Sequence, residues 1–435
     1  MNLSQRRRTD ATRLLTLVIS LLAYFATGAQ IPARANTDLF RAIDRHDFET
    51  LIQIRDNGGL ANEESALAGA ILASMLGADS EAEQMLAALL EREPEPAIRA
   101  RALRSLSGVY VRLGLYDKAA AAMAEIRGMT DSDGVSIDDQ SFAFFSALAP
   151  VGPMKIDYAR GGEISARRDS VGLLRAPLTV NGETDDAVFD TGAAFSTVSV
   201  SMANRMRMRP LGASVEVGGS TEHTVSSGIA IAEEVRIGEI IFHNVPFIVI
   251  PDENLSFPVQ NYSISSIIGL PLIRAMERIE WRISEDGGTM RHSRSQGSAE
   301  PGVANMITSG WQHVVLARIN DSPSRMRLFL DTGANSTDFY ENLLEIAPDL
   351  LDAAETATSR RAGVGGVTEE QELPLAPSYK ITIGDATISA GPTDVLPDDG
   401  SFRHGVLGLD ILTRFDLIEM DFRAMTFRPS GPMNE

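Results

Sequence analysis

The chain has 435 residues, of which 44% are apolar and 23% are charged, so it is long and apolar enough for two or three folded domains. Its formal net charge of −20 argues against nucleic acid as the main partner, because phosphate binding needs a basic surface. The chain contains no cysteine, which excludes disulfides, thiolate metal sites and a cysteine nucleophile.

Residues 1–35 have the pattern of a bacterial secretory signal peptide. Four arginines lie between residues 6 and 13, an apolar run follows from Leu14 to Ala29, and small residues flank Arg34 before a cleavage point. We therefore predict an exported protein, periplasmic or secreted. An uncleaved anchor in the inner membrane is the alternative, although the apolar run is short for a full span.

Residues 36–128 are predicted to be helical, because apolar residues such as Leu39 and Ile43 recur at helical spacing. Gly77 and Gly114 separate later helices and lie 37 residues apart (114 − 77 = 37), close to the period of about 34 residues of a tetratricopeptide repeat. We expect a tetratricopeptide-like helical domain. It either offers a concave surface to a partner protein or only packs on the rest of the chain.

Residues 129–170 are rich in glycine and proline and are predicted to form a linker, with one apolar piece from Phe142 to Leu148. Short strands begin at about residue 171. The apolar stretch 178–180 precedes Asn181-Gly182, a hairpin turn signal, and the returning strand ends at Asp190.

The sequence around Asp190 occurs twice. Asp190-Thr191-Gly192-Ala193 recurs as Asp331-Thr332-Gly333-Ala334 after a second apolar strand, and further landmarks recur in the same order at offsets of 139 to 147 residues. They are Gly218-Gly219 with Gly365-Gly366, Ile237-Gly238 with Ile383-Gly384, Pro251-Asp252 with Pro397-Asp398, and Ile268-Gly269 with Leu407-Gly408. This order indicates an internal duplication, with copies at 171–283 and 306–430 and a linker at 284–305.

Each copy resembles a retropepsin-like subunit of the aspartic protease family: Asp-Thr-Gly-Ala after an apolar strand, a glycine-rich hairpin, then two apolar residues and glycine. The resemblance covers residues 171–428 and implies a bilobal acid-protease fold, architecturally like pepsin, made of two β-barrel lobes in one chain. The expected fold class is therefore multidomain, an N-terminal α-helical repeat domain followed by a mainly β part. The resemblance also implies an aspartic endopeptidase that acts on peptides or proteins without a metal or cofactor.

The chemistry of amide hydrolysis explains why two aspartates are needed. Water must lose a proton to a base, and an acid must protonate first the carbonyl oxygen and then the departing amine. Two close carboxyl groups that share one proton can do both, because like charges so close do not both ionise. We predict that Asp190 and Asp331 are this catalytic pair.

The resemblance assigns supporting roles to other residues. Thr191 and Thr332 would hydrogen-bond across to the other lobe, and the N–H groups of Gly192 and Gly333 would donate to the carboxylates. Glycine would let a strand cross behind each catalytic loop without a clash. These two glycines are Gly269 and Gly408. Two hairpins, called flaps, would close over the substrate. Their predicted residues are Gly218, Gly219, Ser220, Gly365, Gly366 and Val367.

The sequence departs from the family pattern after each motif. Ala194-Phe195 and Asn335-Ser336 lack the acidic pair with which retroviral enzymes hold the substrate backbone. Neither flap has the tyrosine of pepsin. Ala193 and Ala334 have no hydroxyl that could hydrogen-bond to a carboxylate, so we expect the pair to keep its shared proton toward mildly acidic or near-neutral pH.

Other interpretations remain open. Asp190 and Asp331 could be turn residues that cap strand ends. The chain could be a catalytically silent peptide- or protein-binding module that acts with a periplasmic partner, or each lobe could pair with a lobe of another chain. The six histidines are scattered without a His-Glu-x-x-His spacing, so a zinc site is not expected. Ser220 lacks the glycine pattern of a serine hydrolase nucleophile.

Overall fold

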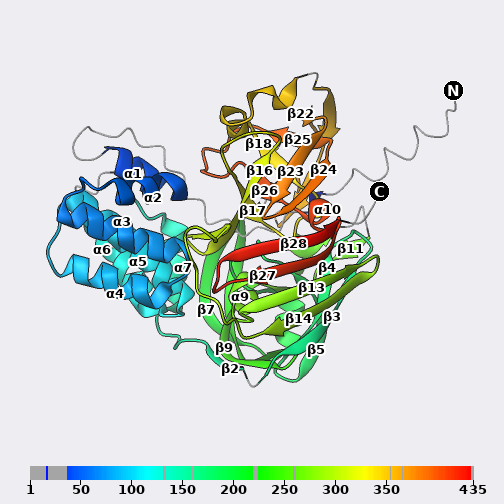
Figure 1. Cartoon of the computed structure of the whole chain (residues 1–435). Helices are drawn as coiled ribbons and strands as arrows, with labels where there is room; N and C mark the ends of the chain where they lie inside the picture. The colour runs from blue at the N-terminus through cyan, green and yellow to red at the C-terminus, as the bar shows by residue number, and fades with distance from the viewer. Residues whose placement is uncertain are drawn as a thin grey trace.

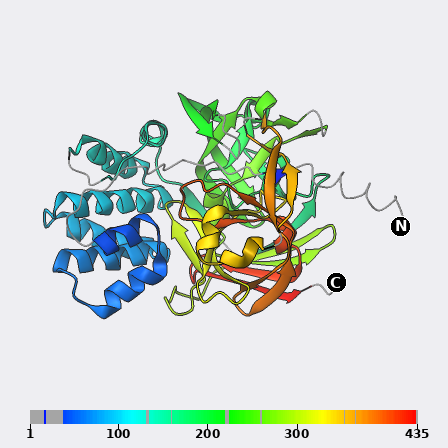
Figure 2. The ribbon, with the colours of Figure 1, turned by 90° about the horizontal axis from the view of Figure 1, so that it is seen from above.

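The computed structural model describes residues 16–17 and 37–432, except 131–133, 159, 219–223, 258–260, 353 and 365. The predicted signal peptide therefore lies outside the described residues, apart from the two-residue strand β1 (Thr16–Leu17), which pairs in parallel with β20 (Arg361–Gly363). A helical N-terminal region is followed by a mainly β region, and the two stand side by side in both views (Figures 1 and 2).

The helical region is built from successive helices that bury their apolar faces against one another. Its helices are α1 (Thr37–Asp44), α2 (Phe48–Asn57), α3 (Asn62–Met75), α4 (Asp79–Leu90), α5 (Pro96–Arg112), α6 (Tyr116–Gly128) and α7 (Asp139–Leu148). Helices α3 and α5 are followed by Gly77 and Gly114, whose φ angles of +68° and +71° suit glycine. No helix among the described residues is long and apolar enough to cross a membrane.

A buried ion network fastens the helical region to the β region. Asp79 of α4 accepts from Nε of Arg112 of α5, at 2.8 Å, and from Nη2 of Arg274 of α9 (Leu270–Arg274) in the β region. Burial alone would raise the pKa of the Asp79 carboxyl, but the charges of the two arginines outweigh it and lower this pKa. The two regions therefore share a charged contact that excludes water.

The β region begins earlier than the sequence indicates. The segment 129–170, predicted as a linker, contains α7, β2 (Lys155–Tyr158) and β3 (Gly162–Arg168), and both strands join the large sheet. The predicted interlobe linker likewise contains β14 (Gly287–Ser293). Glycine and proline in these segments therefore do not mark them as free of structure, since Gly162, Gly287 and Gly288 lie within the strands themselves.

Most strands of the first half of the β region, which carries Asp190, form one sheet. In order of sequence they are β4 (Leu174–Val180), β5 (Glu183–Phe189), β6 (Thr197–Ser199), β7 (Arg209–Gly218), β8 (Thr224–Ile237), β9 (Ile240–Ile250), β12 (Ser266–Ile268) and β13 (Arg278–Ser284), with the short helix α8 (Val200–Arg205) after β6. The strands β10 (Ser256–Phe257) and β11 (Tyr262–Ser263) form a separate pair. The predicted hairpin turn is present, with Asn181 at φ 49° and Gly182 at φ 87° between β4 and β5.

The second half, which carries Asp331, forms a ten-stranded sheet among the described residues. Its elements are β15 (Met306–Ser309), β16 (Gln312–Ile319), β17 (Met326–Leu330), β18 (Asp338–Tyr340), β19 (Thr356–Ser359), β22 (Gln371–Ala376), β23 (Tyr379–Ile383), β24 (Ala386–Ala390), β25 (Thr393–Leu396) and β26 (Gly405–Leu407). Two 3-10 turns, Glu341–Glu345 and Pro348–Leu351, and the helix α10 (Leu409–Leu412) complete it. The strand β21 (Gly366–Val367) pairs with β20 as a separate hairpin.

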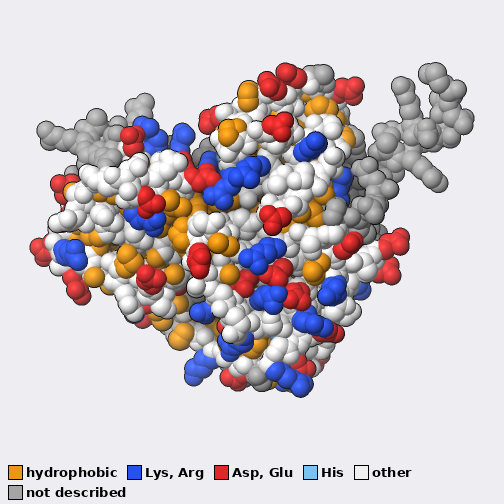
Figure 3. All heavy atoms as spheres, in the orientation of Figure 1, with side chains coloured by type: hydrophobic (Ala, Val, Ile, Leu, Met, Phe, Trp, Pro, Cys, Tyr) orange, Lys and Arg blue, Asp and Glu red, His pale blue; other side chains and the backbone are white. Residues whose placement is uncertain are grey.

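The end of the chain returns to the first half. The strands β27 (Phe415–Asp421) and β28 (Thr426–Pro432) join the first sheet through β13, with Trp281 opposite Ile418. They lie across the front of the β region in Figure 1. The last two strands of the second half therefore belong to the sheet of the first half. On the face drawn in Figure 3, basic and acidic side chains are interspersed rather than segregated.

Candidate active site

The two predicted aspartates occupy equivalent places at the ends of equivalent strands. Asp190 follows β5, which pairs in parallel with β12, and its N–H donates to the carbonyl of Ile268 at 3.0 Å. Asp331 follows β17, which pairs in parallel with β26, and its N–H donates to the carbonyl of Leu407 at 3.2 Å. The same local geometry therefore holds each aspartate where its strand ends.

Two threonines tie the loops together by crossed hydrogen bonds. The N–H of Thr191 donates to Oγ1 of Thr332, and the N–H of Thr332 donates to Oγ1 of Thr191, both at 3.0 Å. Each hydroxyl donates onward to a carbonyl of the opposite half, Thr191 to Leu330 at 2.8 Å and Thr332 to Phe189 at 2.7 Å. These four bonds bring together residues that lie more than 130 positions apart in the sequence.

The glycines of the two motifs explain how closely the loops approach. A methyl group on Gly192 would lie 2.5 Å from Oδ1 of Asp331, and one on Gly333 would meet the carboxyl of Asp190 even more closely. Each carboxyl therefore lies against the glycine of the other half. The N–H groups of Gly192 and Gly333 also donate to Oδ1 of their own aspartates, at 2.7 and 2.8 Å.

Both carboxyl groups are fully buried and electrostatically linked. Burial, followed by the charge of Asp331, raises the pKa of Asp190 well above its usual range. Burial raises the pKa of Asp331 to about 6, although the N–H of Gly333 opposes the shift. Apart from the other carboxyl group, Oδ2 of each aspartate has no hydrogen-bond partner among the described residues. One oxygen of each carboxyl is thus held by its own loop, and the two carboxyl groups also interact with each other through a side-chain hydrogen bond.

Gly269 and Gly408 lie behind the loops that carry Asp190 and Asp331, where a side chain would clash. A methyl group on Gly269 would lie 2.5 Å from the carbonyl carbon of Phe195, and Gly408 is pressed against Ser336 in the same way. The sequence reasoning missed the hydroxyls that fix these glycines. Ser196 accepts from the N–H of Gly269, and Thr337 accepts from the N–H of Gly408, both at 3.0 Å. A hydroxyl residue six positions after each aspartate was the available signal.

The two predicted flaps form hairpins of very different length. The first is β7–β8, in which Gly218 pairs with Thr224, and the second is β20–β21, in which Gly363 pairs with Gly366. Val367 of the second hairpin is 45% exposed. The predicted flap residues Gly219, Ser220 and Gly365 lie outside the described residues.

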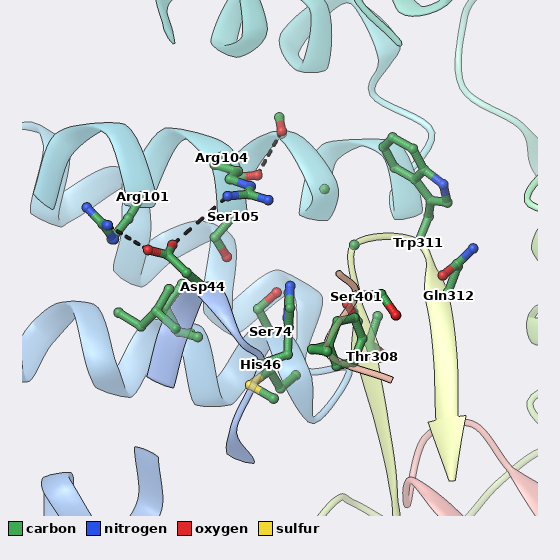
Figure 4. A pocket seen from close by; sticks show the side chains of 18 of the residues that line it. Asp44, His46, Ser74, Arg101, Arg104, Ser105, Thr308, Trp311, Gln312 and Ser401 are labelled. Atoms are coloured by element: carbon green, nitrogen blue, oxygen red, sulfur yellow. Dashed lines mark hydrogen bonds and ion pairs between the residues drawn. The ribbon is translucent and has the colours of Figure 1, made fainter. Parts of the chain in front are cut away.

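Two cavities lie near the junction of the helical and β regions. The larger, of about 180 Å³, lies between α3, α5 and the β15–β16 hairpin, and Asp44 there lies between Arg101 and Arg104 (Figure 4). The smaller, of about 60 Å³, is lined by α7, by β7 and by Phe195. Trp311 lines both. Within the described ranges, no group of three or more histidines and acidic residues could hold a metal ion.

Comparison with known proteins is consistent with this geometry for the first half. Residues 176–272 match the family model described as "Aspartyl protease". No curated protein matches the chain. The crystal structure of a retropepsin-like aspartic protease from Rickettsia conorii is 17% identical, covers 33% of this chain and 98% of its own, and has a TM-score of 0.24. The part of the chain around Asp190 is thus similar in sequence to aspartyl proteases.

Proposed function

We propose that the chain is an aspartic endopeptidase in which Asp190 and Asp331 share one proton and activate a water molecule. The observation that carries the proposal is the set of crossed threonine bonds, which sets two buried carboxyl groups against the opposite glycines. A strand-capping aspartate needs no such partner, whereas a shared proton requires two carboxyl groups in close contact.

The reaction follows from the protonation of the pair. The ionised carboxyl takes a proton from water, whose oxygen attacks the peptide carbonyl carbon, while the protonated carboxyl gives its proton to the carbonyl oxygen. The tetrahedral adduct then loses the amine, which receives the proton that the first carboxyl took up, while a hydroxyl of the adduct returns a proton to the second carboxylate as the new carbonyl group forms. The two carboxyl groups end with one proton between them, as at the start.

The proposal extends to the architecture and the location of the protein. Two tandem retropepsin-like lobes, at 171–283 and 306–430, would each supply one aspartate, and β2 and β3 would extend the first. The five duplicated landmarks support this, because the Ile-Gly turns fall between β8 and β9 and between β23 and β24. The helices at 36–128 would form the tetratricopeptide-like part of an exported, periplasmic or secreted enzyme.

The test is cleavage of a peptide library by the chain beginning at residue 36. We expect the wild type to cleave, and Asp190→Asn and Asp331→Asn each to lose about 10²- to 10⁴-fold in kcat/KM. The matched control is Asp286→Asn, an exposed aspartate in the β13–β14 turn, which should cleave like the wild type. A wild type that binds peptides without cleaving them would instead identify a silent binding module. Activity retained in both single active-site variants would overturn the mechanism.

A further inference from the structure

The smaller cavity is lined by the loop that carries Asp190 and by the base of the first flap. Phe195, which lines it, follows Asp190 by five residues, and Val217 and Gly218 line it from the base of the first flap. In the proposed enzyme, a peptide bound between Asp190 and this flap would extend past these two walls. The cavity is therefore a candidate subsite for the substrate.

The third wall of this cavity comes from α7. Phe144 of α7 packs edge-on against Phe195, with ring centroids 4.8 Å apart, and Phe145 packs against Trp311 at 5.2 Å. Phe145 and Trp311 are in turn part of the junction between the helical region and the second half. The helix is thus held on both sides by aromatic contacts worth about 0.5–1.5 kcal/mol each beyond their buried area.

Helix α7 supplies polar groups that the loop after Asp190 lacks. Ala194 and Phe195 have no polar side chain, whereas Gln140 and Ser141 of α7 line the same cavity. Ser141 is 5% exposed, and its Oγ has no hydrogen-bond partner among the described residues. A buried hydroxyl without a partner is costly, and a peptide backbone in the cavity would provide one.

The size and lining of the cavity indicate what it accepts. The cavity has a volume of about 60 Å³, and one water-sized atom needs about 10–15 Å³. The space therefore suits about four to six atoms, enough for a leucine or isoleucine side chain. Phe144, Phe195, Val217, Ile248 and Trp311 make most of its surface apolar.

We infer that α7 completes the substrate cleft on the Asp190 side, where it forms a subsite for a branched aliphatic side chain and Ser141 hydrogen-bonds the adjacent peptide backbone. This inference rests on the proposed function. It makes the helical region part of the substrate-binding surface of the enzyme.

The test fills the cavity and leaves the rest of α7 unchanged. Ser141→Leu places a side chain in the cavity, and Ser146→Leu makes the same substitution on the exposed face of the same helix. Cleavage by both variants is measured with eight-residue peptides. Each peptide carries either leucine or glycine at one test position, and the test position is moved along the peptide. We expect Ser141→Leu to lower kcat/KM about tenfold or more for peptides with leucine at one position and to leave kcat/KM for the glycine peptides unchanged. Ser146→Leu should retain the wild-type profile.

A binding measurement separates this inference from the proposed function. Fluorescein-labelled leucine and glycine peptides are titrated into Asp331→Asn protein with Ser141, Ser141→Ala or Ser141→Leu, so that no turnover is required. We expect Ser141→Ala, which leaves the cavity open, to weaken binding of all peptides about two- to tenfold, and Ser141→Leu to remove the preference for leucine. The absence of a leucine preference with Ser141 present, or an equal preference in all three proteins, would overturn the subsite whether or not the wild type cleaves.

Discussion

The two halves of the β region match closely around the aspartates and differ at the rim. In each half, a strand ends at an aspartate and the following threonine hydrogen-bonds to the threonine of the other half. In each half, a hydroxyl six residues after the aspartate also accepts from the N–H of the glycine behind the loop. At the rim, the first half has the long β7–β8 hairpin with α7 beside it. The β20–β21 hairpin of the second half has strands of only three and two residues. Shared chemistry constrains the centre equally on both sides, while the rim is free to diverge.

The largest expected effect concerns a contact that the first half makes with the helical region and that has no counterpart among the matched features of the two halves. Asp79→Asn leaves Arg112 and Arg274 buried without their carboxylate, which we expect to lower the free energy of unfolding by about 3–5 kcal/mol. Because the folded-state pKa of Asp79 is lowered, its contribution is present above pH about 4 and is lost as the pH falls. Urea unfolding of Asp79→Asn and of Glu83→Gln, which breaks only an exposed pair on α4, measures the difference.

The next effect should be equal on both sides. Gly192→Ala and Gly333→Ala each force the opposite carboxyl to move by about 1 Å, which we expect to lower kcat/KM about 10²-fold or more. Gly128→Ala is the control, since a methyl group there meets nothing within 4 Å. A large loss for only one of the two glycines would show that the centre is not symmetric.

The threonine bonds provide a smaller symmetric test. Thr191→Val and Thr332→Val each leave a buried N–H and a buried carbonyl of the opposite half unpaired, and we expect each to cost about 1–3 kcal/mol of unfolding free energy. Thr184→Val, in an exposed cross-strand pair, should change it by less than about 0.5 kcal/mol. Unequal costs for the two buried threonines, measured by urea unfolding, would contradict equal roles.

The smallest effect concerns the pH dependence of cleavage. Activity requires one proton on the pair, so it should fall about tenfold per pH unit below about pH 6, where the second proton binds. Ala193→Ser and Ala334→Ser each add a hydroxyl that can donate to the ionised carboxyl, which lowers its pKa. We expect each to move this limb of the pH–kcat/KM profile down by about one unit. An unchanged profile in both variants would refute the role assigned to the alanines.

The centre of the site could be predicted from the sequence because its determinants are local and repeated. The Asp-Thr-Gly-Ala motifs, the Asn181-Gly182 turn and the two Gly-rich hairpins each specify their own backbone, and the duplication points to their partners. The roles of Ser196 and Thr337 could also have been predicted from the sequence, since a hydroxyl residue follows each aspartate at the same separation in the sequence.

The rim could not be predicted, because it depends on contacts that no local pattern specifies. The apolar piece at Phe142–Leu148 indicates a docked segment, but nothing in it identifies Phe195 and Trp311 as its partners. The sequence likewise does not indicate that β27 pairs with β13 and β28 with β27, because alternating apolar residues fit any neighbouring strand. Tetratricopeptide-like repeats, export and the domain boundaries stay predictions.

The crossed threonine bonds make the site conditional on the whole chain. Thr191 depends on the backbone at 330–332, which the ribosome adds about 140 residues later. A nascent or truncated chain that ends before residue 331 has Asp190 without Asp331 and lacks three of the four crossed threonine bonds, which all involve Thr332. On the proposed function, hydrolytic activity would therefore begin only when synthesis is nearly finished and both halves have folded together.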